Sequence, residues 1–233
     1  MLFITTFLCC VILSFVLRDL ILKYAPVFYA ISIVVIVAYS LHSFGLITIP
    51  HTLWRVMFEL IQECTLPLAL FAVVMFVGAL PHDTALCKTL RSIRGPLSIV
   101  AWMLSLGHMA TYIASYAPRI ADGATLSSNV GISFVVAFIL FILLMVLGIT
   151  SFQMVKKHMS TSRWKFIQRF AYLFFGLAYV HVIIMLIPSA LRGGIAAQQS
   201  IAAYTLVFAL YLVARLYRWQ KDKQASAVQK LSE

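Results

Sequence analysis

The stretch Val130–Ser151, VGISFVVAFILFILLMVLGITS, decides the fold class of this chain. It contains no charged residue. A helix needs about 20 mainly apolar residues to cross the ~30 Å hydrocarbon core of a bilayer, and this stretch supplies them. The run is longer than a strand and does not alternate between apolar and polar residues, so a membrane helix is favoured over a strand of a lipid-spanning barrel.

The composition of the whole chain extends this conclusion. Of its 233 residues, 63% are hydrophobic and 11% are charged, and the mean hydropathy is +0.99. We predict an all-α, polytopic membrane helix bundle of about seven transmembrane helices, within which a six-helix core is also compatible with the runs. The runs lie at 2–17, 27–47, 64–80, 95–116, 130–151, 165–188 and 200–217. Residues 48–63 are expected to lie at the outer interface or to extend the third span.

The positive charges lie mostly on one side of the predicted membrane. Lysine and arginine in short loops are retained in the cytoplasm, and of the 18 Lys and Arg residues only Arg55, Arg119 and Arg192 fall on the other side. We therefore predict a multi-pass protein of a cell membrane, a bacterial inner membrane, with the N-terminus outside and the C-terminus in the cytoplasm. This bias and attraction to anionic lipid account for the net charge of +11, so no nucleic-acid partner is expected.

Two histidines, His108 and His181, fall inside predicted spans. Each lies roughly 20 Å from a residue near the cytoplasmic side, Arg94 or Gln168, at about 1.5 Å per helical residue. Both are therefore expected in the outer half of the bilayer at a similar depth. An ionisable side chain is costly there, so these histidines are candidates for a functional site.

A pair of histidines on two helices is typical of a haem held between two neutral imidazoles, one on each face of the iron. The small residues Ser105, Gly107, Gly176 and Ala178 lie near the histidines and could make room for the ring. The alternative is a structural contact between helices. The protein would then be a haem-free transporter or an assembly scaffold.

A resemblance to a known family adds to this interpretation. Residues Arg94–Tyr112, followed by LLMVLGITSFQMVKKHMSTSRWKFIQRFAYLFFGLAYVH (143–181), resemble the ferric reductase-like transmembrane family. Within it they are similar to the branch of haem-binding membrane subunits of the periplasmic methionine sulfoxide reductase system. The resemblance covers residues 54–217 and is most specific at Thr150-Ser151 and Trp164–Tyr172. It implies a b-type haem and electron transfer across the membrane.

The chain departs from that family at one position. Where the family has Trp-x-x-Leu-His-Arg, this chain has Trp164-Lys165-Phe166-Ile167-Gln168-Arg169, so an inner haem ligand is replaced by Gln168. An amide oxygen is a poor ligand for haem iron, so one haem b is expected. A second haem stays open, since His82 or His158 could supply the inner ligand.

The remaining histidines are expected near the membrane interfaces: His42, His51, His82 and His158. A second candidate site lies at the inner ends of the fourth and sixth spans, where cations and hydrogen-bonding groups stand beside an apolar wall. Its members are Arg94, Trp164, Gln168 and Arg169. They suit a quinone or a second haem, although positive-inside topology alone explains the same cations.

These observations predict a membrane b-type cytochrome that passes electrons to an acceptor on the outer face. The expected donor is quinol or a partner flavoprotein, and the acceptor is a redox protein or a reductase subunit, which would carry the substrate chemistry. We expect N-terminal membrane helices over 1–53, the haem-binding domain over 54–217 and a cytoplasmic polar tail over 218–233.

Overall fold

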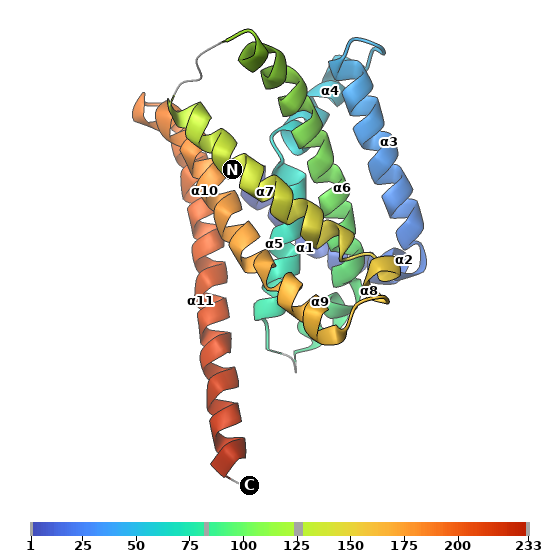
Figure 1. Ribbon diagram of the computed structural model, residues 1–233, viewed down its shortest axis with the longest axis vertical. Coiled ribbons are helices and arrows are strands. Elements are labelled where there is room, and N and C mark those ends of the chain that lie inside the picture. Colours follow the sequence, from blue (N-terminus) through green and yellow to red (C-terminus); the bar gives the residue numbers. More distant parts are fainter. Residues whose placement is uncertain (1, 82–83, 124–127, 232–233) are drawn as a thin grey trace.

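The computed structural model describes residues 2–81, 84–123 and 128–231, and helices make up nearly all of this part of the chain (Figure 1). The helices are α1 (Leu2–Val16), α2 (Arg18–Lys23), α3 (Ala25–Ser43), α4 (His51–Met57), the π-helix η1 (Phe58–Gln62), α5 (Thr65–Ala79), α6 (Ala85–Ala121), α7 (Ser128–Ile149), α8 (Gln153–Lys156), α9 (Thr161–Gln168), α10 (Phe170–Leu191) and α11 (Ile195–Leu231). No strand occurs among these described residues. The predicted all-α bundle is confirmed.

Five helical segments of the described chain are long and apolar enough to cross a membrane: Ala25–Ser43, Cys87–Ala121, Asn129–Ile149, Thr161–Leu191 and Ile195–Gln224. A sixth is formed if His51–Gln62 and Thr65–Ala79, which meet at a bend of 44°, count as one broken span. Helix α1 has 15 residues, or about 22 Å at 1.5 Å per residue, which is short of a ~30 Å hydrocarbon core. All seven predicted runs are helical, and α1 and α5, with 15 residues each, are the shortest.

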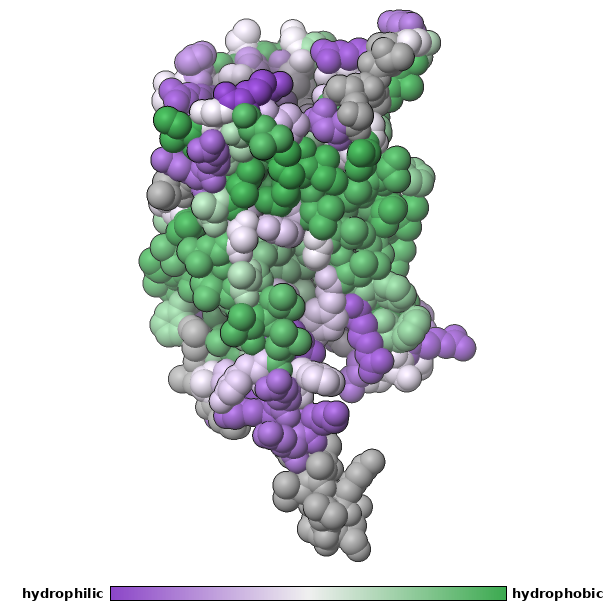
Figure 2. Space-filling model, turned by 90° about the vertical axis from the view of Figure 1, so that its left-hand side faces the viewer, coloured by the Kyte–Doolittle hydropathy of each residue, from purple (hydrophilic) through white to green (hydrophobic). Residues whose placement is uncertain are grey.

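Apolar side chains form a broad belt across the face seen in Figure 2, with hydrophilic residues gathered toward both ends. Large apolar side chains of the spanning helices are exposed, among them Val34 of α3 at 65% and Phe138 of α7 at 64%. Exposed apolar surface on this scale needs a cover other than water. The chain is therefore a multi-pass membrane protein whose belt contacts the lipid bilayer.

Helix α5 lies at the centre of the bundle and is buried along most of its length. It packs against α1, α6, α11 and η1, and small residues such as Ala69 and Ala72 let these helices approach closely. The N-terminal helix belongs to the same core, because the ring of Phe3 stacks on Tyr204 with centroids 4.1 Å apart. Helix α1 is therefore part of the central packing, and residue 217 lies inside the continuous helix α11.

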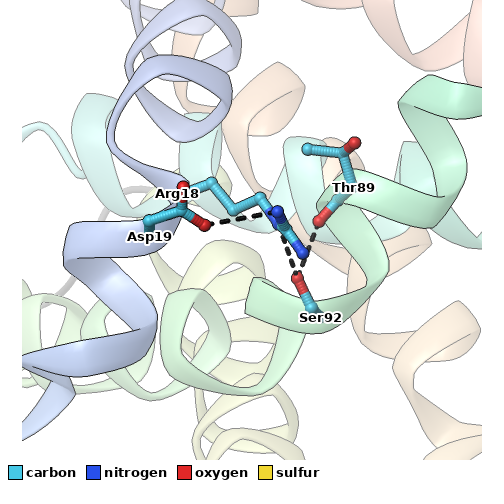
Figure 3. A network of polar contacts seen from close by, with 4 residues as sticks. All are labelled: Arg18, Asp19, Thr89 and Ser92. Atoms are coloured by element: carbon cyan, nitrogen blue, oxygen red, sulfur yellow. Dashed lines mark hydrogen bonds and ion pairs between the residues drawn. The ribbon is translucent and has the colours of Figure 1, made fainter.

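We call the end of the bundle that carries α2, α8, α9 and the start of α6 the basic end (Figure 1). There, Arg18 joins α2 to α6 in the network drawn in Figure 3. Its Nε donates to Ser92 Oγ at 3.3 Å, and its Nη1 lies 3.2 Å from Asp19 Oδ1. Ser92 in turn donates to the carbonyl of Thr89 at 2.8 Å. The charge of Arg18 is thus paired locally.

Candidate functional site

His108 lies on α6, and its ring nitrogen Nδ1 contacts the backbone carbonyl of Gln62 at the end of η1. A carbonyl oxygen can only accept a hydrogen bond, so Nδ1 carries the proton and donates it. In the neutral ring the lone pair is then on Nε2. The Gln62 contact therefore selects the tautomer of His108.

The Gln62 carbonyl is available because the chain breaks between η1 and α5. Cys64 has a φ of 57°, in the left-handed region, and the two helices meet at 44°. Carbonyls at the end of a helix have no partner within it, so another donor must satisfy them. Pro67 is the sequence signal for the break, because it cannot donate an N–H to the preceding turn. The sequence predicted that residues 48–63 lie at the outer interface or extend the third span, but it did not indicate that Gln62 contacts His108.

His181 lies on α10, and its Nδ1 is 3.0 Å from the hydroxyl of Ser133 on α7. Helix α7 packs closely along α10, and Ser133 is buried. The signal that could have identified Ser133 is a lone hydroxyl in the otherwise apolar run that follows Gly131. Among the described residues, no partner bonds to Nε2 of His181 or to Nε2 of His108.

The structure brings the two histidines near each other. Both side chains are partly buried, and the rings of His108 and His181 are close enough to interact electrostatically. Tyr112, one turn along α6, adds an aromatic ring whose centroid is 4.8 Å from that of His108. The site therefore consists of two imidazoles from α6 and α10, held by partners from η1 and α7.

The small residues near the histidines have different surroundings. A Cβ on Gly107 would lie 3.0 Å from Ile61 and 3.4 Å from Ile36, so Gly107 permits a close contact of α6 with its neighbours. A Cβ on Gly176 would meet nothing within 4 Å. Ser105 and Ala178 are buried. Open space thus adjoins Gly176, an exposed residue five positions before His181 on α10, and not Gly107.

Two residues of the second candidate site meet at the end of α7. Trp164 Nε1 donates to the carbonyl of Thr150 at 3.1 Å, and Gln168 Nε2 donates to Thr150 Oγ1 at 3.2 Å. Lys156 lies over the Trp164 ring, with Nζ 4.4 Å from its centroid. The side chains of Trp164 and Gln168 therefore link α9 to the end of α7 through hydrogen bonds.

The other two residues of that set lie elsewhere. Arg169 is exposed at the junction of α9 and α10. Arg94 reaches toward α5, where its Nη1 is 3.8 Å from the position that a Cβ on Gly78 would occupy. The structure thus joins Trp164 with Gln168 and gives Arg94 different neighbours.

The remaining histidines have local roles or lie outside the described chain. The backbone N–H of Ile49 donates a hydrogen bond to Nδ1 of His42 at 3.1 Å. His51 is exposed at the start of α4, and exposed His158 contacts the carbonyl of Met154 at 2.7 Å. His82 is outside the described residues.

Comparison with known proteins yields a relative from Treponema pallidum (strain Nichols), an "Uncharacterized protein", that is 35% identical over 164 residues. The match covers 70% of this chain and 45% of the relative, so the chain spans less than half the length of that protein. No protein-family model and no solved structure matches the chain.

Proposed function

We propose that the chain is a membrane b-type cytochrome of the ferric reductase-like type, in which His108 and His181 hold one haem b. One observation carries the proposal: each Nδ1 has a partner on a neighbouring helix, and each Nε2 has none among the described residues. A histidine that binds a metal through one ring nitrogen usually donates the N–H of the other to a fixed acceptor. The Gln62 carbonyl fixes this arrangement for His108, and the Ser133 hydroxyl, which can accept as well as donate, permits it for His181.

The donor set fits a haem better than a bare metal ion. Among the described residues, no group of three or more His, Cys, Asp or Glu side chains could hold an ion. A porphyrin brings its own equatorial nitrogens, so a protein needs to add only axial ligands. Two neutral imidazoles, one from α6 and one from α10, meet this requirement.

Haem, when bound, supplies one-electron chemistry, and the residues of this chain set its surroundings. The Gln62 carbonyl keeps the proton of His108 on Nδ1, which would leave the lone pair of Nε2 to ligate a haem iron. Ser133 orients the ring of His181 from α7. The apolar helices keep water away from both imidazoles.

The proposed direction of electron flow rests on the orientation that the basic residues give the protein in the membrane. Basic residues crowd the end with α2, α8 and α9, which the positive-inside rule assigns to the cytoplasm. The histidines then lie nearer the outer face, where a redox protein or a reductase subunit accepts the electrons. Quinol or a partner flavoprotein supplies them. Gln168 is engaged by Thr150, which favours one haem over two.

The test is the spectrum of the purified protein. Wild type should show a Soret band and sharp α and β bands on reduction, whereas His181→Ala should lose the low-spin spectrum. Added imidazole should restore that spectrum to His181→Ala, because the free base can occupy the space of the missing ring. His51→Ala is the matched control and should keep the wild-type spectrum, since His51 is exposed.

A second variant separates ligation from folding at His108. His108→Asn keeps an N–H donor near the Nδ1 position, so the contact with the Gln62 carbonyl can persist, but it offers the iron no imidazole. We expect folded protein without low-spin haem. A colourless wild type from haem-replete cells would favour the haem-free scaffold in which the two histidines only join helices. An unchanged haem spectrum in both variants would show that other residues ligate the haem.

A further inference from the structure

Two arginines from distant parts of the chain converge at the basic end of the bundle. Arg215 of α11 donates from Nη1 to the carbonyl of Gly78 at 3.4 Å. Arg94 of α6 lies beside the same residue, with Nη1 3.8 Å from the position that a Cβ on Gly78 would occupy. The two guanidinium groups are close enough to interact electrostatically. Two like charges, one from α6 and one from α11, thus lie beside the end of α5 at the basic end of the bundle.

Within the part of the chain that the structure describes, these charges have no carboxylate partner. Among the described residues, ion pairs neutralise Arg18, Arg55 and Arg218, but none reaches Arg94 or Arg215. Arg215 lies over the ring of Tyr172, with its guanidinium carbon 4.9 Å from the centroid. A π face attracts a cation but does not neutralise it. The pair therefore lacks a counter-charge among the residues that the structure describes.

A buried hydroxyl adjoins the same cluster. Tyr211 of α11 is only 8% exposed, and its Oη has no hydrogen-bond partner among the described residues. Tyr211 lies one turn before Arg215 on α11, and its ring centroid is 5.6 Å from that of Phe76, which lies two residues before Gly78 on α5. A buried hydroxyl without a partner is costly, so an acceptor beside it would stabilise the protein. Two guanidinium groups, which favour an anion, and one hydroxyl group, which favours a hydrogen-bond acceptor, therefore lie close to Gly78.

We propose that Arg94, Arg215 and Tyr211 bind the phosphate group of an anionic phospholipid at the basic end of the bundle. A guanidinium group can donate two parallel hydrogen bonds to a phosphate group, and its positive charge compensates the negative charge of the headgroup. A quinone is neutral and would leave both charges uncompensated. Tyr211 Oη is closed to solvent here, so a phosphate oxygen can reach it only if the side chains that cover it move.

A lipid is favoured over a soluble phosphate by the surroundings of the cluster. Leu212 and Leu216 flank Arg215 on α11 and are 56% and 50% exposed. Acyl chains can lie on this apolar surface while the headgroup reaches the arginines. Clusters of cations next to the apolar belt are favourable places for anionic headgroups. This inference is independent of the two histidines and of any haem.

The experiment is native mass spectrometry of delipidated protein titrated with phosphatidylglycerol, with phosphatidylcholine as the zwitterionic comparison. Wild type should retain phosphatidylglycerol in preference. Arg94→Gln and Arg215→Gln should each weaken its binding by about tenfold or more, since each removes a charged hydrogen bond. Tyr211→Phe should weaken binding several-fold while the lipid-free protein stays folded, because the lost hydroxyl had no partner.

Matched controls distinguish a specific phosphate-binding site from general electrostatic attraction between the basic end and anionic lipid. Arg163→Gln removes an exposed charge at the same end, and Tyr217→Phe removes an exposed hydroxyl from the same helix. Both should bind lipid as wild type does. Equal weakening by Arg163→Gln, equal retention of phosphatidylcholine, or displacement of the lipid by a neutral quinone analogue would overturn the proposal. Displacement by millimolar inorganic phosphate would show phosphate recognition from a soluble source and overturn the assignment to lipid.

Discussion

Replacing Gly148 with alanine tests the packing of α6 on α7, the helices that carry His108 and Ser133. A Cβ on Gly148 would lie 2.1 Å from both Cδ1 and Nε1 of Trp102 and 2.5 Å from its Cγ. Carbon atoms in contact normally stay about 3.5–4.0 Å apart, so the ring or the helix must move by roughly 1.5 Å. The edge of Phe152, at a centroid distance of 5.6 Å, restricts how the rigid indole can turn.

The magnitude follows from two opposing effects. Inserting a methyl group into a packed contact typically costs about 1–3 kcal/mol, whereas alanine is favoured over glycine in a helix by about 1 kcal/mol. We expect Gly148→Ala to lower the free energy of unfolding by about 1–2 kcal/mol, because the clash involves a ring and not a flexible chain end. Gly131→Ala on the same helix is the control. Its Cβ would meet nothing within 4 Å, so it should be neutral or stabilising by about 0.4–1 kcal/mol.

The assay is reversible unfolding in mixed micelles of detergent and SDS, followed by circular dichroism. Trp102→Leu in the Gly148→Ala background should remove most of the cost, which a double-mutant cycle measures as a coupling energy. If Gly148→Ala is as stable as Gly131→Ala, or if Trp102→Leu leaves its cost unchanged, then Trp102 does not lie against Gly148 and the packing argument fails.

Three further predictions concern orientation, stoichiometry and haem retention. Reporter fusions after Lys157 and at the C-terminus should be cytoplasmic and one within 121–127 external, because cations are retained inside; opposite signals would place the histidines at the wrong face. The pyridine haemochrome assay should give close to one haem per chain, unchanged in Gln168→Ala, and a ratio near two would contradict the argument from that residue. Ser133→Ala should weaken haem retention by about 10–100-fold in transfer to apomyoglobin, since the ring of His181 loses its fixed partner; an unchanged transfer rate would separate Ser133 from the site.

The helices of this bundle were largely predictable from hydropathy. The transfer of an apolar side chain into lipid is a local property, and it adds up along a run of about 20 residues whatever the rest of the chain does. The predicted runs accordingly correspond to α1, α3, α5, α6, α7, α10 and α11. Their ends were less accurate: α6 and α11 continue into polar residues, because a helix can extend beyond the lipid core into water.

The contacts between helices needed the tertiary structure. The sequence by itself determined that His108 and His181 are rare ionisable residues in apolar spans, because this follows from composition and depth. Only the fold decided that a broken helix presents the Gln62 carbonyl to one ring and that Ser133 meets the other. It also decided which residues surround Arg94. Such pairings depend on the rotation and tilt of each helix against its neighbours, which packing of the whole bundle sets and which no local pattern contains.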